Sequence, residues 1–298
     1  MNSVVVTGVS SGIGWGITKV LLKKGFRVFG SVRQEKDALR LEAEFGQAFT
    51  PLIFDITDEA AVRRSAAEVE RLLGGERLAG LVNNAGMALA GPLLYQPLED
   101  FRQQLEVNLV GPLIATKAFA ALLRSKGSHK AGRIVNITSV GGKMAAPFLG
   151  AYAASKHGLE GMSEALRREL MLYGIDVIIV APGSVATRTW DKAESADVEI
   201  YAATPYAKAL KKFIDYMVVE GRKGYKPERI GEVVFTALTT ARPRVRYEAI
   251  PQKVKNWTLP NLLPRRWLDR LIARQVGLRP EPSTKSSVQA SGTMTFNL

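Results

Sequence analysis

The chain has 298 residues, no cysteine, and a formal net charge of +13 from 41 Lys and Arg against 28 Asp and Glu. Without cysteine it can hold no disulfide, no thiolate metal site and no thiol nucleophile. Hydrophobic residues at 46% and charged residues at 23% are ordinary globular values and exclude wholesale disorder. The positive charge leaves four explanations open: nucleic acid, an anionic membrane, an anionic cofactor, or solubility alone.

The first residues contain no basic segment followed by an apolar segment and a small-residue cleavage site, so we expect no signal peptide. No stretch approaches 18 uncharged apolar residues, so we expect no transmembrane helix. These features together predict a cytoplasmic protein.

Short β-branched apolar runs alternate along the chain with stretches whose apolar residues have helical spacing. The runs that predict strands are 4–6, 26–29, 52–54, 78–82, 133–137 and 176–180. The stretches that predict helices include 13–22, 58–73, 101–123 and 154–172. This alternation indicates βαβ units, and the nearly continuous apolar strands indicate burial on both faces. We predict an α/β fold: one doubly wound, Rossmann-type parallel sheet with helices on both faces and ligands at the carboxyl ends of its strands.

The pattern loosens after residue 183. Residues 184–225 are mixed, with weak helical texture, whereas 228–239 predicts a helix and 244–249 a final strand. We therefore predict one domain over residues 1–250 and a basic, apolar C-terminal extension over 251–280. Residues 281–298 are rich in Ser and Thr with few apolar side chains, which predicts a disordered tail.

A glycine-rich run, Thr7-Gly8-Val9-Ser10-Ser11-Gly12-Ile13-Gly14, follows the first predicted strand and opens the first predicted helix. Glycines permit a tight turn and close backbone approach to a pyrophosphate, and a helix N-terminus offers free N–H groups to its oxygens. The alternative is that the turn only packs a helix on a strand. Its place directly after a strand favours nucleotide binding.

Further motifs follow this loop in order, some directly after predicted strands and others in predicted helices. They are Asp55, Asn83-Asn84-Ala85-Gly86, Asn108, Ser139, Tyr152-Ala153-Ala154-Ser155-Lys156, and Pro182-Gly183 with Thr187. With the Gly-x-x-x-Gly-x-Gly spacing, this series resembles the short-chain dehydrogenase/reductase family over roughly residues 3–190. The C-terminal part and the sequences around Ser11 and Arg33 look like the hydroxysteroid and retinol dehydrogenase branch.

The resemblance implies a catalytic domain over 1–250 that binds NADP(H), with the segment 184–225 closing over the substrate. The cofactor-binding positions that it implies are Gly8, Ser10, Ser11, Gly12, Ile13, Gly14, Arg33, Asp55, Ile56, Asn83, Ala85, Gly86, Tyr152, Lys156, Pro182, Gly183, Val185 and Thr187. For the Asn-Asn-Ala-Gly run the alternative is that it mainly stabilises its own turn.

The end of the second predicted strand favours NADP over NAD. An acidic residue there would accept hydrogen bonds from the ribose hydroxyls of NAD, and none appears before Glu35. Arg33 can instead pair with a 2′-phosphate, and Ser11 can donate a hydroxyl to it. The alternative is that Arg33 is a solvated surface arginine.

Tyr152 and Lys156 are four residues apart and therefore lie on one helical face. A nearby ammonium lowers the pKa of a tyrosine, which would make Tyr152 a general acid/base, while Ser139 would orient the same substrate oxygen. The resemblance adds that Lys156 holds the nicotinamide ribose and that Asn108 anchors a water in a proton relay. The alternatives are a surface Tyr–Lys pair and an Asn bonded to the backbone.

The predicted substrate contacts are Ser139, Val140, Tyr152, Met87 and Trp190, in segments with few charges, so we expect a small apolar carbonyl or alcohol. Trp190 and nearby aromatic residues either form a lid or fill a small core beneath it. The two histidines lack the partner spacing of a zinc site, so we expect no metal. The leading hypothesis is an NADP(H)-dependent oxidoreductase. The alternative is a catalytically silent NADP-binding sensor or scaffold of the same fold.

The resemblance also implies a homodimer or homotetramer. We expect no nucleic-acid partner, because the chain has no RNA-binding motif, zinc finger or interleaved basic and aromatic stripe. Much of the positive charge gathers in residues 242–280, interleaved with Trp257, Leu262, Leu263 and Trp267. That pattern permits a weak peripheral contact with an anionic membrane, and the alternative is a solvated surface over a small apolar cluster.

Overall fold

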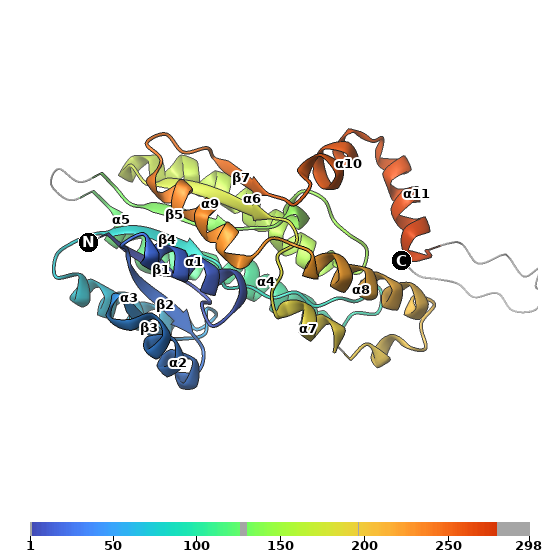
Figure 1. Cartoon of the computed structure of the whole chain (residues 1–298), viewed down its shortest axis with the longest axis horizontal. Coiled ribbons are helices and arrows are strands. Elements are labelled where there is room, and N and C mark those ends of the chain that lie inside the picture. Colours follow the sequence, from blue (N-terminus) through green and yellow to red (C-terminus); the bar gives the residue numbers. More distant parts are fainter. Residues whose placement is uncertain (1, 126–129, 196, 279–298) are drawn as a thin grey trace, which may run out of the picture.

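Parallel strands form the centre of the molecule, and helices cover both faces of their sheet (Figure 1). The computed structural model describes residues 2–125, 130–195 and 197–278. Within these residues the sheet has seven strands in the order β3-β2-β1-β4-β5-β6-β7, and all neighbouring pairs are parallel. The predicted doubly wound, Rossmann-type fold is confirmed.

The strands are β1 (Ser3–Val6), β2 (Arg27–Val32), β3 (Phe49–Ile53), β4 (Leu78–Asn83), β5 (Arg133–Ile137), β6 (Asp176–Pro182) and β7 (Arg246–Ala249). The helices up to β6 are α1 (Gly12–Lys23), α2 (Glu35–Phe45), α3 (Glu59–Leu73), α4 (Leu98–Leu105), α5 (Gly111–Leu123) and α6 (Gly150–Glu169). After β6 come α7 (Thr189–Glu194), α8 (Ala207–Arg222), α9 (Pro227–Thr239), α10 (Leu259–Leu262) and α11 (Arg265–Val276).

Successive side chains of each strand point to opposite faces, which divides the core in two. In β1, Val4 and Val6 join the cluster beneath α1, α2 and α9, whereas Val5 joins the cluster beneath α3 and α5. All three valines are fully buried. This two-sided burial explains why the strands read as continuous apolar runs in the sequence.

The carboxyl ends of β1 and β4 lie side by side at the point where the strand order reverses. The glycine loop follows β1, the Asn-Asn-Ala-Gly run spans the end of β4, and Ser139 follows β5. Ligands of open α/β sheets bind at such a reversal, because the loops on its two sides diverge there. The fold therefore gathers the predicted motifs at one edge.

The segment expected to have weak helical texture contains a well-formed helix, α8. Its buried residues, including Leu210, Phe213 and Val218, share one side of the helix, while Lys211 and Lys212 lie outside. The prediction of weak helical texture over 184–225 thus underestimated the helix in this segment, because the flanking turns obscured a clear amphipathic pattern. Helix α2 was not predicted either.

A continuous helical segment, Leu98–Leu123, is long and apolar enough by composition to cross a membrane. In this fold it is a core helix: Ala115, Phe119 and Leu123 are fully buried against the sheet. It also contains a π-helical turn, Glu106–Val110, that places the buried Asn108 toward the reversal point. We therefore assign it to the domain core.

The extension after β7 ends in α11, which packs on α8 at one end of the molecule (Figure 1). Val276 joins a third core cluster with Phe148, Tyr201, Leu210 and Phe213. The extension therefore helps to hold the substrate segment in place. The tail predicted at residues 281–298 lies outside the described residues.

Candidate active site

The glycine loop has the geometry of an anion cradle. Gly8 and Gly12 have φ angles of +70° and +60°, and a Cβ on Gly14 would lie 2.1 Å from the carbonyl oxygen of Gly8. Helix α1 begins at Gly12, and its N-cap residue Ser11 forms no side-chain capping bond. The first turn of α1 therefore presents uncapped N–H groups at the reversal point, which suits the pyrophosphate of a dinucleotide.

This loop is fastened to β4 by polar contacts. Asn84 donates through Nδ2 to the carbonyl oxygens of Thr7 and Gly8, at 2.8 and 2.9 Å. The Thr7 hydroxyl accepts the N–H groups of Asn84 and Ala85 at 2.9 and 3.0 Å. These bonds to the end of β4 thus fix the shape of the glycine loop. Neither Thr7 nor Asn84 was among the predicted cofactor contacts, because these bonds join residues 76 to 78 positions apart.

Asn83, a predicted cofactor contact, directs its side chain into the core. Its Nδ2 donates to Thr116 Oγ1 at 3.2 Å and to Asn136 Oδ1 at 2.8 Å, and Asn136 in turn donates to Ser163. All four side chains are buried. The Asn83 side chain therefore joins β4 to α5 and β5 inside the core.

Arg33 follows the last residue of β2, is exposed, and has no ion pair or hydrogen bond among the described residues. Arg40, seven residues on, is by contrast engaged: it donates to the Ser10 carbonyl at 2.7 Å and pairs with Asp37 and Glu44. Arg33 is therefore free to bind an anion beside the loop, while Arg40 holds the loop itself.

Asp55 and Ile56, two of the predicted cofactor contacts, follow β3. The Asp55 carboxylate accepts from the N–H and hydroxyl of Thr57 at 3.0 and 2.8 Å. Ile56 is buried against Gly111 of α5.

The loop after β6 returns to the glycine loop. The side chain of Thr187 comes near Gly12, since a Cβ added there would lie 3.5 Å from Thr187 Cγ2. Gly183 donates to the Ala249 carbonyl, and Val185 pairs with Tyr225. These contacts bring the segment after Pro182 across the dinucleotide cleft.

Ser139 and Tyr152 meet at the carboxyl end of β5. The phenol ring and the Ser139 hydroxyl both lie against Gly141, where an added Cβ would approach Tyr152 Cε1 to 3.2 Å and Ser139 Oγ to 3.4 Å. A hydrogen bond links the two side chains. Ser139 also accepts from Gly141 N at 3.0 Å, which fixes the 3₁₀ turn Val140–Gly142. A carbonyl oxygen can therefore meet both hydroxyls together.

Lys156 lies one turn beyond Tyr152 on α6 and is only 5% exposed. Its Nζ donates to the Ile137 carbonyl at 3.0 Å and lies 5.9 Å from the centre of the Tyr152 ring. Within the described residues it forms no ion pair with a carboxylate. Burial lowers the pKa of Lys156 to about 8.

The sequence predicted a lowered pKa for Tyr152, and this prediction was wrong for the chain without cofactor. Burial raises the pKa of Tyr152, and the hydrogen bond with Ser139 opposes that effect without reversing it. The sequence showed the neighbouring ammonium but not the depth of burial, which disfavours the charged phenolate. Tyr152 is thus held as a neutral phenol, the form that can donate a proton.

Asn108 joins the site to the loop after β4. Its Oδ1 accepts from Met87 N and its Nδ2 donates to Met87 O, both at 2.8 Å, and to Ser155 Oγ at 3.0 Å. A Cβ on Gly86 would lie 3.0 Å from Asn108 Oδ1 and 3.6 Å from Lys156 Nζ. The space that a side chain would fill at Gly86 therefore lies between the Asn108 amide and the Lys156 ammonium. Two of the three Asn108 bonds go to the Met87 backbone, as the alternative of an Asn bonded to the backbone expects. Asn108 itself lies in the π-helical turn.

Two of the predicted substrate residues lie beside this cluster. Met87 is fixed by Asn108, and Val140 begins the turn after Ser139. Trp190 is engaged elsewhere: its indole donates to the Val185 carbonyl at 2.7 Å and its ring packs against Gly221 of α8. Phe213 and Tyr201 are buried in the third cluster, so these aromatic residues build the core of the substrate segment.

A buried carboxylate beneath the Ser139 turn was not found from the sequence. Glu160, on α6, accepts from Thr138 Oγ1 at 2.8 Å and pairs with Arg246 of β7 at 3.1 Å. Arg246 also binds Glu248 at 2.6 Å, and Glu248 binds Lys253 in the extension. No local motif links residues 86 positions apart, so the sequence offered no signal for this pair.

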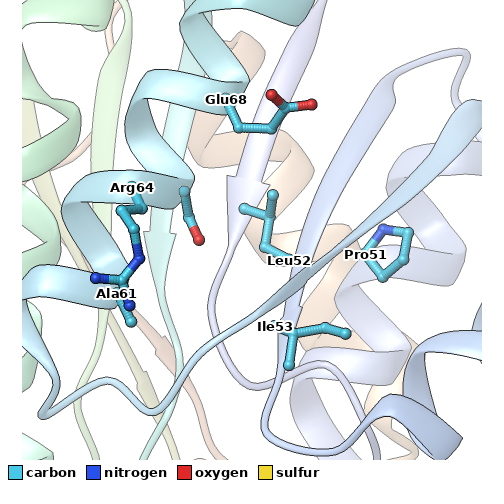
Figure 2. A pocket seen from close by; sticks show the side chains of 7 residues that line it. Pro51, Leu52, Ile53, Ala61, Arg64 and Glu68 are labelled. Atoms are coloured by element: carbon cyan, nitrogen blue, oxygen red, sulfur yellow. The ribbon is translucent and has the colours of Figure 1, made fainter.

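A surface hollow also lies between β3 and α3, lined by Leu52, Ile53, Arg64 and Glu68 among others (Figure 2). Because β3 is an edge strand, this hollow is separated from β5 by three intervening strands. Within the described residues, no group of three or more His, Asp or Glu side chains is arranged to hold a metal ion.

Comparisons with known proteins agree with this geometry. The family model of the short chain dehydrogenases matches residues 2–197. The chain is 38% identical over 278 residues to an NADPH-dependent 3-dehydrocapnine reductase of Ornithobacterium rhinotracheale, covering 93% of this chain and 98% of that protein. It is 32% identical to mouse retinol dehydrogenase 16, covering 93% and 89% of the two chains.

A solved short chain dehydrogenase/reductase of Burkholderia phymatum, in complex with NAD, has the same fold. The TM-score is 0.73 at 21% identity, with 87% of this chain and 92% of that chain covered. With its seven-stranded sheet, its glycine loop and the Ser139, Tyr152 and Lys156 cluster, this chain belongs to the short-chain dehydrogenase/reductase family of oxidoreductases.

Proposed function

We propose that this protein is an NADP(H)-dependent oxidoreductase that interconverts an apolar ketone or aldehyde and its alcohol. The observation that carries the proposal is the cluster at the end of β5. There, Ser139 and Tyr152 converge on one point, and the buried Lys156 lies behind them without a counter-ion among the described residues. A buried cation of this kind costs stability, so its presence argues for a chemical role.

The residues present fit a nicotinamide dinucleotide: the crowded Gly14 and the uncapped start of α1 form the phosphate cradle. When bound, that cofactor supplies the hydride for the carbonyl carbon. Tyr152 donates its phenolic proton to the carbonyl oxygen, and Ser139 donates a hydrogen bond to the same oxygen. The Lys156 ammonium stabilises the resulting tyrosinate. Asn108 and Lys156, facing each other across Gly86, hold a water that returns a proton to Tyr152.

We propose NADP(H) as the cofactor because Arg33, the cation after β2, forms no ion pair or hydrogen bond within the described residues. Arg33 is exposed and unpaired within the described residues, and it follows β2, whose Ser31 accepts the N–H groups of Gly8 and Val9 in the glycine loop. A guanidinium binds a phosphate by two parallel hydrogen bonds, so Arg33 is suited to a 2′-phosphate. The relative from Ornithobacterium is NADPH-dependent by name, which supports the same preference.

The proposed substrate is an apolar ketone. The relative that is 38% identical acts on a 3-dehydro compound, a name that denotes a carbonyl where the parent carries a hydroxyl. In this chain, Met87 and Val140 lie beside the Ser139 cluster, and the segment from Val140 to the buried Phe148 has one charged residue, Lys143, which pairs with Glu160. These segments therefore offer mainly apolar contacts to a substrate. We therefore propose a ketone attached to an apolar chain or ring, reduced to the alcohol.

The test is NADPH consumption with a panel of 3-dehydrocapnine, steroid, retinoid and aliphatic ketones and aldehydes, at matched concentrations. We expect turnover with at least one apolar ketone and a loss of about 10²–10⁴-fold in kcat for Tyr152→Phe, with NADPH binding retained. The matched control is Tyr173→Phe, which removes an exposed phenol near the end of the same helix. NADPH binding without consumption of any substrate would instead favour the silent sensor or scaffold, and full activity of Tyr152→Phe would contradict the mechanism.

A further inference from the structure

The outward face of α11 differs from the other charged helical surfaces of this protein. Several cations on other helices pair with an acidic residue of the same helix: Arg63 pairs with Glu59, Arg71 with Glu68, and Lys211 with Asp215. On α11, Arg265, Arg266, Arg270 and Arg274 are all exposed, and none forms an ion pair or hydrogen bond within the described part of the chain. Four unpaired guanidinium groups on one 12-residue helix form a concentrated positive surface.

Apolar side chains accompany these cations on the same face. Leu268 and Val276 turn inward and are 9% and 3% exposed. Trp267 and Leu271 are four residues apart and therefore share another side of the helix, where they are 63% and 51% exposed. Arg266, Arg270 and Arg274 form the adjoining row on this outer side. The helix thus has two dissimilar apolar sides, one docked on the protein and one facing outward next to arginines.

The preceding segment also carries exposed apolar side chains. Leu259 and Leu262 of α10 are 54% and 75% exposed, and Val254 is 66% exposed. Between residues 251 and 278 the sequence contains six Lys and Arg but only one acidic residue, Asp269. Figure 1 shows α10 and α11, in red, as an arm at one end of the molecule beside α8. We call the exposed side chains of Val254, Leu259, Leu262, Arg266, Trp267, Arg270, Leu271 and Arg274 the arm surface.

We propose that the arm surface binds the surface of an anionic lipid bilayer, with Trp267 and the exposed leucines entering the headgroup region and the arginines contacting lipid phosphates. A bilayer interface offers negative charge and apolar depth together, and it suits a helix that carries a tryptophan and leucines between arginines. Nucleic acid offers negative charge but no depth for aliphatic side chains.

The chain's own residues 279–298 fit this surface less well. They contain two cations, Arg279 and Lys285, and a single carboxylate side chain, Glu281. They therefore do not complement a row of arginines. A second copy of the arm would bring like charges together. Charge complementarity thus selects an anionic bilayer over both alternatives.

The position of the arm gives this contact a consequence for the site. Helix α11 packs on α8, and Val276 shares a core cluster with Phe213 of α8 and with Phe148, which lies between the Ser139 turn and α6. A bilayer bound at the arm would therefore lie next to the elements that surround the substrate. This consequence rests on the proposed function, whereas the binding itself does not and can be tested without substrate.

The test is flotation of the full chain with vesicles of phosphatidylcholine alone or with about one third phosphatidylglycerol. We expect binding to the anionic vesicles only, weakening as salt rises from 50 to about 300 mM, because screening shortens the reach of the charges. Arg266→Gln/Arg270→Gln/Arg274→Gln should lower the partition coefficient about 100-fold, and Trp267→Ser/Leu271→Ser about tenfold or more.

The matched control is Arg63→Gln/Arg64→Gln/Arg71→Gln in α3, which removes the same net charge far from the arm and should change binding less than threefold. A chain ending at residue 278 should bind as the full chain does. Equal binding to neutral vesicles, an equal loss in the α3 control, or unchanged binding by Trp267→Ser/Leu271→Ser would each overturn the proposal. In the last case the arm would only be an anion-binding surface, as for an acidic protein. Circular dichroism and melting temperature of each variant report on folding independently.

Discussion

Lys156 and Glu160 lie one turn apart on α6, and both are almost fully buried, yet their surroundings are opposite. Glu160 is surrounded by partners: Thr138 donates to it, and Arg246 and Lys143 pair with it. Lys156 has one carbonyl as a partner and no carboxylate among the described residues.

The difference shows that two buried charges on α6 have different roles, one structural and one chemical. A buried charge that is fully paired fixes neighbouring elements, here α6, β7 and the residue before Ser139. A buried charge left without a counter-ion is costly for folding but available for chemistry, since its field acts on whatever enters the site. The four predictions below test whether the two regions really differ in this way.

The largest effect is expected for Lys156→Met. Without the ammonium, the tyrosinate that forms at Tyr152 loses its stabilising charge, so kcat should fall about 10²–10⁴-fold. Because the buried charge is also gone, the variant without cofactor should resist urea better than the wild type at pH 7. Steady-state kinetics and urea unfolding measure the two effects. Lys156→Arg, which keeps the charge, should not gain stability, and a Lys156→Met variant that is less stable at pH 7 would contradict the comparison.

Arg246→Met should have the opposite effects: a large loss of stability and a small change in kcat. It leaves the Glu160 carboxylate buried with Thr138 and the more distant Lys143, which should cost about 3 kcal/mol of unfolding free energy. Its kcat should change far less than that of Lys156→Met. Replacing both partners, as Glu160→Leu/Arg246→Met, should recover more than half of the lost stability, because no charge is then stranded. Equal losses for the single and double variants would show that the pair is not coupled.

The pH dependence of stability follows from the lowered pKa of Lys156, about 8 in the folded chain against its ordinary value of 10.5. Between these values the unfolded chain binds a proton that the folded chain does not, so wild-type stability rises with pH relative to Lys156→Met. The advantage of the variant should be about 2–3 kcal/mol below pH 8 and should vanish toward pH 10.5. Urea unfolding of both proteins at several pH values measures it, and a constant difference would contradict the assignment.

The smallest effect tests an unpaired cation at the surface. Arg33→Ala should raise KM for NADPH about 10–100-fold, leave KM for NADH nearly unchanged, and alter the unfolding free energy by less than about 0.5 kcal/mol. Arg40→Ala is the matched control: because Arg40 holds the Ser10 carbonyl, it should weaken both cofactors alike. Equal losses of NADPH and NADH affinity in Arg33→Ala would remove the basis for the NADP preference.

The sequence could predict whatever depends on local pattern. The apolar runs placed the strands from β1 to β6, and the glycine spacing placed the loop after β1. The spacing of Tyr152 and Lys156 predicted a shared helical face, and the structure places them on α6 with Ser139 nearby.

What depended on distant contacts could not be predicted in this way. The Glu160–Arg246 pair and the Thr7–Asn84 bonds join residues far apart in the chain, and neither has a local signature. The raised pKa of Tyr152 depends on burial, which is a property of the folded cluster. The sequence left Trp190 open between a lid and a small core, because it does not show that Gly221 lies against the Trp190 ring.

The central place of β1 has a consequence for the synthesis of the chain. Within this sheet β1 is made before its partners, yet it needs β2 on one side and Leu78–Asn83 on the other. Until β4 has left the ribosome, the edge formed by Val4, Val5 and Val6 has no strand to pair with. An apolar edge of this kind favours pairing with other chains. The period most exposed to aggregation is therefore translation, well before the active site exists.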